Sequence, residues 1–214
     1  MEQIGFLVLG WLFGLLSPNV VDHIRRPYLR RELIGSILAE LDEMRYTMAS
    51  VAYAVKDHLF ESSDEFLDWL LPVVRAYEGP RSSLQLAPTI EQLRAVGESA
   101  RLAMLRARAV PGRGLGLKEY GLPFTNAKAS DMRICSLDFQ RAVFSISGKV
   151  DMFNQQVRYL QRQAELTFDA SLDEPNRSAV QDNLDRGARM LGNAAITIVN
   201  DISQLTHDST KHAG

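Results

Sequence analysis

The sequence predicts an all-α protein: a single N-terminal transmembrane helix, residues 1–22, followed by an antiparallel bundle of four to five helices, residues 23–214. Three observations support this prediction. The chain begins with a long apolar stretch. Farther along, apolar residues recur every three or four positions, which is typical of helices that pack lengthwise. The alternation of apolar and polar residues that marks strands is almost absent.

The apolar stretch runs from Ile4 to Leu16 without a charge and reaches Val21 through Ser-Pro-Asn. A spanning helix needs roughly 17 to 25 mainly apolar residues, so the stretch suffices if Ser-Pro-Asn lies near the headgroups. No Lys or Arg precedes it and no small-residue cleavage site follows. This pattern favours an uncleaved anchor over a cleaved signal peptide or a surface-lying helix. The expected anchor side chains are Ile4, Phe6, Leu7, Trp11, Phe13 and Leu16.

Four arginines follow the stretch: Arg25, Arg26, Arg30 and Arg31. Because Lys and Arg stay on the cytoplasmic side, we expect a short N-terminus outside the inner membrane and a cytoplasmic C-terminal domain. The arginines either set this topology alone or also contact anionic headgroups, at about 1 kcal/mol each.

Two glycines of the apolar stretch, Gly10 and Gly14, are four residues apart and therefore lie on one side of a helix. Small residues at this spacing allow two membrane helices to approach closely. The pair predicts a face on which copies of the anchor associate.

Long apolar seams are predicted in three helices of the body. The first helix starts near residue 29 and ends near residue 60, and Pro27 before it fits a break or a first turn between anchor and helix. The others cover residues 130–169 and the region after Pro175. These three should form the spine of the bundle. The seam residues of the first are Ile34, Ile37, Leu41, Met44, Met48, Val51, Val55 and Leu59.

Two further helices are predicted to pack across this spine. One is opened by a capping box of Ser62 and Glu65 and ends at Gly79-Pro80. The other covers residues 90–109 as one helix and is opened by Thr89 with Gln92.

A glycine-rich loop, residues 110–126, separates these helices from the second half of the chain. It lacks the preceding strand and the Gly-Lys-Ser/Thr ending of a phosphate-binding loop. Its large apolar residues predict that it docks on its own bundle, and the alternatives are contact with a partner or lipid, or disorder. The residues that such a partner would meet are Leu115, Leu117, Tyr120 and Phe124.

Catalytic, cofactor-binding and metal-binding residues are not predicted. The four histidines lack partners at ligand spacing, and Cys135 stands alone and should be buried. Glu40 and Glu43 form a Glu-x-x-Glu pair without the Glu-x-x-His of di-iron bundles, which indicates a solvated face. Nucleic acid is not expected as a partner, because the net charge is −2 and no basic face stands out in the body.

These observations predict a membrane-anchored cytoplasmic bundle that acts through self-association or partner binding, as a scaffold or as a membrane-perturbing effector. Its partners would be membrane lipids and either further copies of the chain or a separate protein. Two alternatives remain. One is a ligand-sensing bundle, which needs a cavity of a few hundred Å³. The other is an enzyme whose site assembles only in space.

Overall fold

The computed structural model describes the backbone of residues 2–80, 86–108, 115–167 and 173–211, and the side chains of these residues apart from residues 2–24, 174, 210 and 211. Across this part of the chain the secondary structure is helical and contains no strand, which confirms the all-α prediction. The elements in order are α1 (Glu2–His58), α2 (Asp64–Arg75), α3 (Leu86–Val96), α4 (Glu98–Arg108), α5 (Pro123–Ala127), the 3-10 helix η2 (Asp131–Ile134), α6 (Leu137–Leu166) and α7 (Glu174–Lys211).

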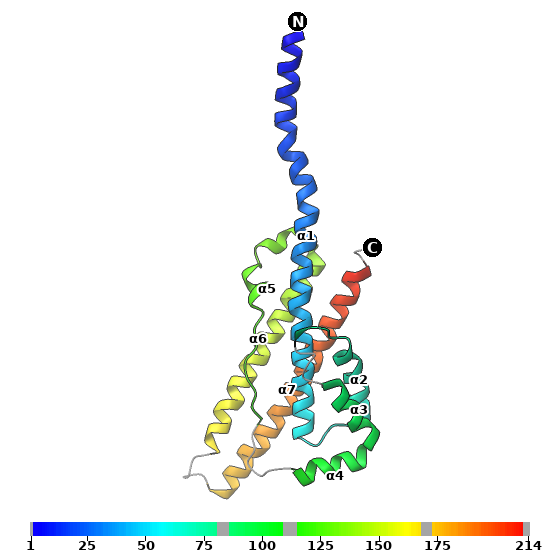
Figure 1. The fold of residues 1–214 in the computed structure, drawn as a ribbon. Helices are drawn as coiled ribbons and strands as arrows, with labels where there is room; N and C mark the ends of the chain where they lie inside the picture. The colour runs from blue at the N-terminus through cyan, green and yellow to red at the C-terminus, as the bar shows by residue number, and fades with distance from the viewer. Residues whose placement is uncertain (1, 81–85, 109–114, 168–172, 212–214) are drawn as a thin grey trace.

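The long helices α1, α6 and α7 form the spine of the bundle, as predicted, and α7 packs against both of the others (Figure 1). Two glycines of α7 allow this close packing. A Cβ atom on Gly187 would overlap the Leu160 side chain of α6, and one on Gly192 would lie 2.9 Å from Val55 Cγ1 of α1. Because glycine lacks a Cβ atom, α7 can approach a neighbour on each side.

The predicted seams supply the core of the spine. In α1 the seam from Ile37 to Val55 is buried, and its end residues Ile34 and Leu59 are half-buried. The seam of α7 packs directly against it, and the seam of α6 packs against α7. Their buried residues are Val143, Ile146, Val150, Phe153, Val157 and Leu160 of α6 and Leu191, Ala195, Ile198, Ile202 and Leu205 of α7.

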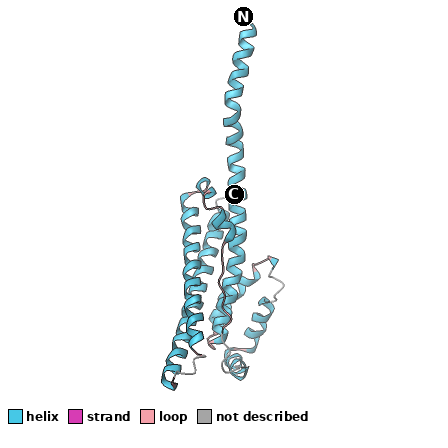
Figure 2. Ribbon diagram, turned by 90° about the vertical axis from the view of Figure 1, so that its left-hand side faces the viewer, coloured by secondary structure: helices cyan, strands magenta, loops and turns pink. Residues whose placement is uncertain are grey.

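Helix α1 is continuous from Glu2 to His58, so the break predicted at Pro27 is wrong. Proline removes one helical hydrogen bond and leaves the carbonyl of residue 23 without its usual donor. The surrounding residues 25–31 are exposed, so water can reach this carbonyl. The 57 residues of α1 span roughly 86 Å at 1.5 Å per residue. Its N-terminal part projects beyond all the other helices in both views (Figures 1 and 2).

No helix among the residues with described side chains is both long enough and apolar enough to cross a membrane. The predicted anchor, residues 1–22, lies outside those residues.

Three helix starts differ from the prediction. The N-cap of α2 is Ser63, whose hydroxyl accepts a hydrogen bond from Phe66 N, and not Ser62. Helix α3 already begins at Leu86, before Thr89. The region predicted as one helix of forty residues starts with the short η2, and Ser136 then caps α6 by accepting from Phe139 N.

The single helix predicted over residues 90–109 is divided into α3 and α4. Gly97 separates them with a φ of +81°, in the left-handed region that favours glycine. A glycine in this conformation ends a helix. The amide of Arg101 restarts the next one by bonding the Gly97 carbonyl.

Candidate functional site

The predicted anchor residues Ile4, Phe6, Leu7, Trp11, Phe13 and Leu16, with the predicted association face Gly10 and Gly14, lie outside the described side chains. Their backbone belongs to the projecting part of α1.

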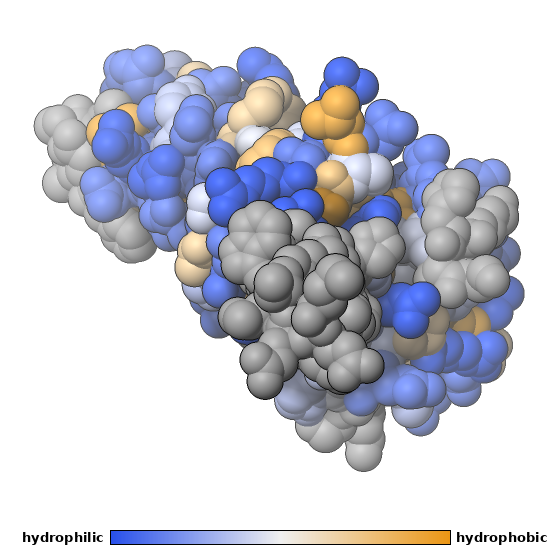
Figure 3. Space-filling view, turned by 90° about the horizontal axis from the view of Figure 1, so that it is seen from above, coloured by the Kyte–Doolittle hydropathy of each residue, from blue (hydrophilic) through white to orange (hydrophobic). Residues whose placement is uncertain are grey.

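The four arginines that follow the predicted anchor are exposed on α1. Three of them, Arg26, Arg30 and Arg31, line an open groove of about 1960 Å³. The groove lies between α1, the start of α6 and the last turns of α7. Seen from above, hydrophobic side chains with hydrophilic ones around them are exposed at this end of the molecule (Figure 3). The apolar residues of the groove include Ile34, Leu38, Phe139, Ile146 and Leu205.

The charged residues of this groove have a basic excess. Lys149 and Asp201 form an ion pair within it. Of the others, Arg133 of η2 joins the three arginines of α1, and Asp138 and Asp208 carry the opposite charge. Arginines beside apolar side chains suit a ligand that has an anionic group and an apolar part. The sequence alone did not reveal this groove, because its residues come from three separate helical segments.

The described part of the glycine-rich loop, residues 115–126, docks on its own bundle. Leu115, Leu117, Tyr120 and Phe124 are half-buried and pack against the core. Asn154 of α6 holds the segment, since its side chain accepts from Tyr120 N at 2.9 Å and donates to Tyr120 O at 2.6 Å. This was the first of the alternatives predicted for the loop.

Glu40 does not lie on a solvated face, which corrects the prediction for the Glu40 and Glu43 pair. Its carboxylate accepts hydrogen bonds from Phe124 N (2.8 Å), Thr125 N (2.7 Å) and Thr125 Oγ1 (2.6 Å). These amides belong to the first turn of α5, where helical donors lack partners. Glu40 therefore caps α5 from another helix and ties the loop to α1. The nearby Glu43 carboxylate accepts from the Tyr77 hydroxyl at 3.5 Å.

Helix α6 has a second apolar seam on the side away from α7. It is formed by large side chains that are between 42% and 69% exposed: Leu137, Phe144, Met152, Tyr159 and Leu166. Their spacing of seven, eight, seven and seven residues keeps them on one side of a helix with 3.6 residues per turn. We call these five residues the outer face of α6.

The outer face lies opposite the buried seam of α6. Its seam positions between the apolar residues hold Arg141, Gly148, Gln155 and Arg162. A Cβ atom on Gly148 would meet nothing within 4 Å, so the middle of this face is open. Exposed single apolar residues are ordinary, but an apolar row along a whole helix marks an interaction surface.

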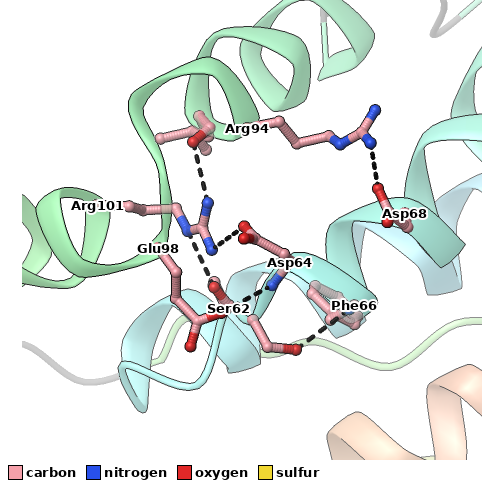
Figure 4. Close-up of polar contacts among 9 residues, drawn as sticks. Ser62, Asp64, Phe66, Asp68, Arg94, Glu98 and Arg101 are labelled. Carbon is pink, nitrogen blue, oxygen red and sulfur yellow. Dashed lines mark hydrogen bonds and ion pairs between the residues drawn. The ribbon is translucent and has the colours of Figure 1, made fainter.

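A polar cluster joins α2 to α3 and α4 (Figure 4). Its centre is Arg101, which is fully buried. Its guanidinium donates to Ser62 O at 2.9 Å, to Leu93 O at 3.0 Å and to Asp64 Oδ1 at 2.8 Å. Glu98 accepts from Asp64 N at 3.2 Å.

Two titratable groups of α1 lie near this cluster. Burial, with the neighbouring Asp57 carboxylate, raises the pKa of Tyr53 to about 12. Burial also raises the pKa of Asp57, against the lowering effect of its hydrogen bond from Tyr53 and of Arg108. Within the described part of the chain no base bonds the buried Ser62 hydroxyl. The cluster therefore holds α2, α3 and α4 together, and its described residues include no activated nucleophile.

Groups of three or more His, Cys, Asp or Glu that would hold a metal ion are not found among the described residues. Cys135 is buried and free, as predicted. Burial raises the pKa of its thiol, which keeps it protonated and unreactive at neutral pH.

Among the residues with described side chains, the outer face of α6 and the basic groove are thus two surfaces that suit binding. Comparison of the chain with models of protein families, with curated proteins and with solved structures gives no match.

Proposed function

We propose that this protein is a membrane-anchored helical bundle that acts through association, with its N-terminus outside the inner membrane and its bundle in the cytoplasm. The observation that supports this most is the form of α1. One helix contributes a buried seam to the core and then continues beyond the bundle along the apolar stretch of residues 4–21. A helix that leaves its bundle has to meet another apolar phase for such residues to be stable.

The arginines at the base of the projection fit this role. From Val21 to Arg26 a helix rises about 7.5 Å, and to Arg31 about 15 Å. The headgroup layer on each side of a bilayer is roughly 5 to 8 Å thick. Arg26 then lies at the headgroups, and the longer reach of Arg30 and Arg31 brings their charges toward the same level. The groove beside them faces the same end of the bundle.

Association is supported by the outer face of α6. Its apolar side chains are exposed in the isolated chain, and covering them by another protein surface would remove them from water. A protein of this kind serves as a scaffold or, if several anchors pack together, perturbs the bilayer.

Extraction of membranes tests the anchor. The full chain should stay in the membrane pellet after an alkaline carbonate wash, and Leu12→Arg should release it, because an arginine at the centre of a span costs roughly 2.5–3.5 kcal/mol. The matched control Leu12→Ile should stay in the pellet. Release of the unaltered chain by the wash would overturn the proposed anchoring.

Orientation is tested by protease added to intact cells with a permeabilised outer surface. A tag placed before Met1 should be cleaved, while the bundle should be protected until the inner membrane is opened. Protection of the tag together with cleavage of the bundle would reverse the proposed topology.

A further inference from the structure

We propose that the outer face of α6 is the interface for a second copy of this chain, and that two copies pair with their α6 helices side by side in the same direction. The orientation rests on the proposed function, because copies anchored by the same end in one membrane leave it in the same direction. The interface itself rests on the described side chains of α6.

The size of the surface fits a pair of copies. The five residues of the outer face extend over 29 steps of helix, roughly 44 Å. At their observed exposure they present on the order of 500 Å² of side-chain surface, since large side chains carry roughly 150–250 Å² each. A standard interface buries about 800 Å² per partner, so the outer face supplies its apolar centre and the flanking residues its rim.

The spacing of the outer face fits another helix as the occupant. A full helix-pairing seam has two apolar residues in every seven, and the outer face supplies one of these two rows along the length of α6. The identical helix of a second copy fits as the partner, because two copies related by a two-fold axis present the same row to each other. Around such an axis along the membrane normal, Phe144, Met152 and Tyr159 each meet their own counterpart.

The residues between the apolar positions shape this pairing. Gly148 lies at the middle of the row with open space beside it, so the two helices can approach closely there. Arg141 and Arg162 lie toward the ends, and their long side chains can carry the charges out to solvent. Charged residues at seam positions weaken a helix pair while they restrict its register. A weak pair is sufficient in a membrane, where confinement raises the effective concentration of the copies.

Cysteine cross-linking of the full chain in its membrane tests both the face and the direction. In a Cys135→Ser background, Gly148→Cys and Gln155→Cys are each placed alone in the chain and oxidised mildly with copper-phenanthroline. In a parallel pair each position lies opposite itself, so each variant should form a disulfide-linked dimer. The matched control is Asn193→Cys, an exposed position on α7 with no role in the outer face.

The expected yield of dimer is about tenfold or more above the α7 control. Cross-linking only when Gly148→Cys and Gln155→Cys are expressed together would overturn the parallel direction, because an antiparallel pair that joins Phe144 to Tyr159 sets residue 148 opposite residue 155. No dimer above the control in any combination would overturn the interface.

Two exposed methionines provide a second comparison. In the Gly148→Cys chain, Met152→Glu should reduce the dimer about tenfold or more, since a carboxylate would be buried against its own counterpart. Met190→Glu, at an equally exposed site on α7, should leave the yield unchanged. Equal yields for both would overturn the proposal.

A carbonate wash of the same samples separates this inference from the anchor. Protein that is retained in the pellet without forming a dimer overturns the pairing alone. Protein that is released overturns the anchoring.

Discussion

The spine of α1, α6 and α7 and the arm formed by α3 and α4 are held in different ways. The spine helices share seams of buried aliphatic and aromatic side chains. In the arm the buried residue of α3 is Ile90 and that of α4 is Arg101. Polar contacts supplement this smaller set of buried residues there. Arg101 joins α4 to the start of α2, Arg94 pairs with Asp68, and Arg75 pairs with Glu91.

One bundle is therefore held together by two kinds of interaction, apolar burial in the spine and ion pairs in the arm. Apolar burial stabilises roughly in proportion to area and is not weakened by the ionic screening that acts on charges. Exposed ion pairs contribute about 0–1 kcal/mol each and are screened by salt. The arm should therefore open locally at a lower free energy than the spine, which unfolds only with the whole bundle.

The largest expected effect comes from a cavity in the spine. Leu191 is fully buried in α7, so Leu191→Ala should lower the free energy of unfolding by about 2–5 kcal/mol. Hydrogen exchange measured by mass spectrometry should show faster exchange in α1, α6 and α7 together. The adjacent Met190→Ala, at a site that is mostly exposed, should change stability by less than about 0.5 kcal/mol. Equal effects of the two would contradict a core built on α7.

A smaller and local effect is expected from Arg101→Met. The substitution leaves the carbonyls of Ser62 and Leu93 without their donor, which costs about 1–3 kcal/mol. Exchange should accelerate in α3 and α4 while the spine keeps its protection. Arg106→Met, at an exposed position of the same helix, serves as the control. Loss of protection in the spine would show that arm and spine are one cooperative unit.

Glu40→Gln tests the attachment of the loop to the spine and should cost about 1 kcal/mol. Both carboxylate oxygens accept from Phe124 and Thr125, whereas the amide has one acceptor oxygen, so at least one bond is lost and the charge that strengthens the others is removed. Limited proteolysis should cut residues 115–126 faster than in the unaltered chain. Glu32→Gln, which is exposed on the same helix, should leave the cutting rate unchanged.

The smallest expected effect is a pH dependence of stability that comes from Glu61, in the turn between α1 and α2. Burial acts to raise the pKa of Glu61, but hydrogen bonds from Arg189 and Lys56 outweigh it and hold the pKa below the ordinary 4.5. A lowered carboxyl pKa contributes stability that is present above pH 4.5 and is lost as the pH falls through the folded-state pKa. Thermal unfolding of Glu61→Gln should therefore be less sensitive to pH below 4.5 than that of the unaltered chain. An identical pH profile would remove Glu61 from this role.

The spine could be predicted from the sequence because its helices bury apolar residues at regular spacing. Seams such as Val143 to Leu160 predict which side of a helix faces the core without knowledge of its neighbours. The division at Gly97 was missed, because a lone glycine inside a helical pattern does not reveal its φ.

The arm and the candidate surfaces depend on tertiary contacts that spacing does not encode. The sequence pattern does not distinguish Arg101 from a solvated arginine, because its acceptors Ser62 O, Leu93 O and Asp64 Oδ1 are brought to it by the fold. Glu40 likewise bonds a segment more than eighty residues away. The outer face of α6 does have a sequence signal, the row from Leu137 to Leu166. It was overlooked because Arg141, Gly148, Gln155 and Arg162 interrupt it.

Since α1 runs without a joint from its N-terminal part into the core, rotation of that part about its own axis turns the whole bundle with it. A flexible tether would let each copy tumble and would leave the meeting of two outer faces to chance. The continuous helix instead restricts each copy to rotation about the axis of α1, so less orientational entropy is lost when two copies associate. Insertion of a short glycine-serine linker after Arg31 would remove this alignment while keeping the same contact residues.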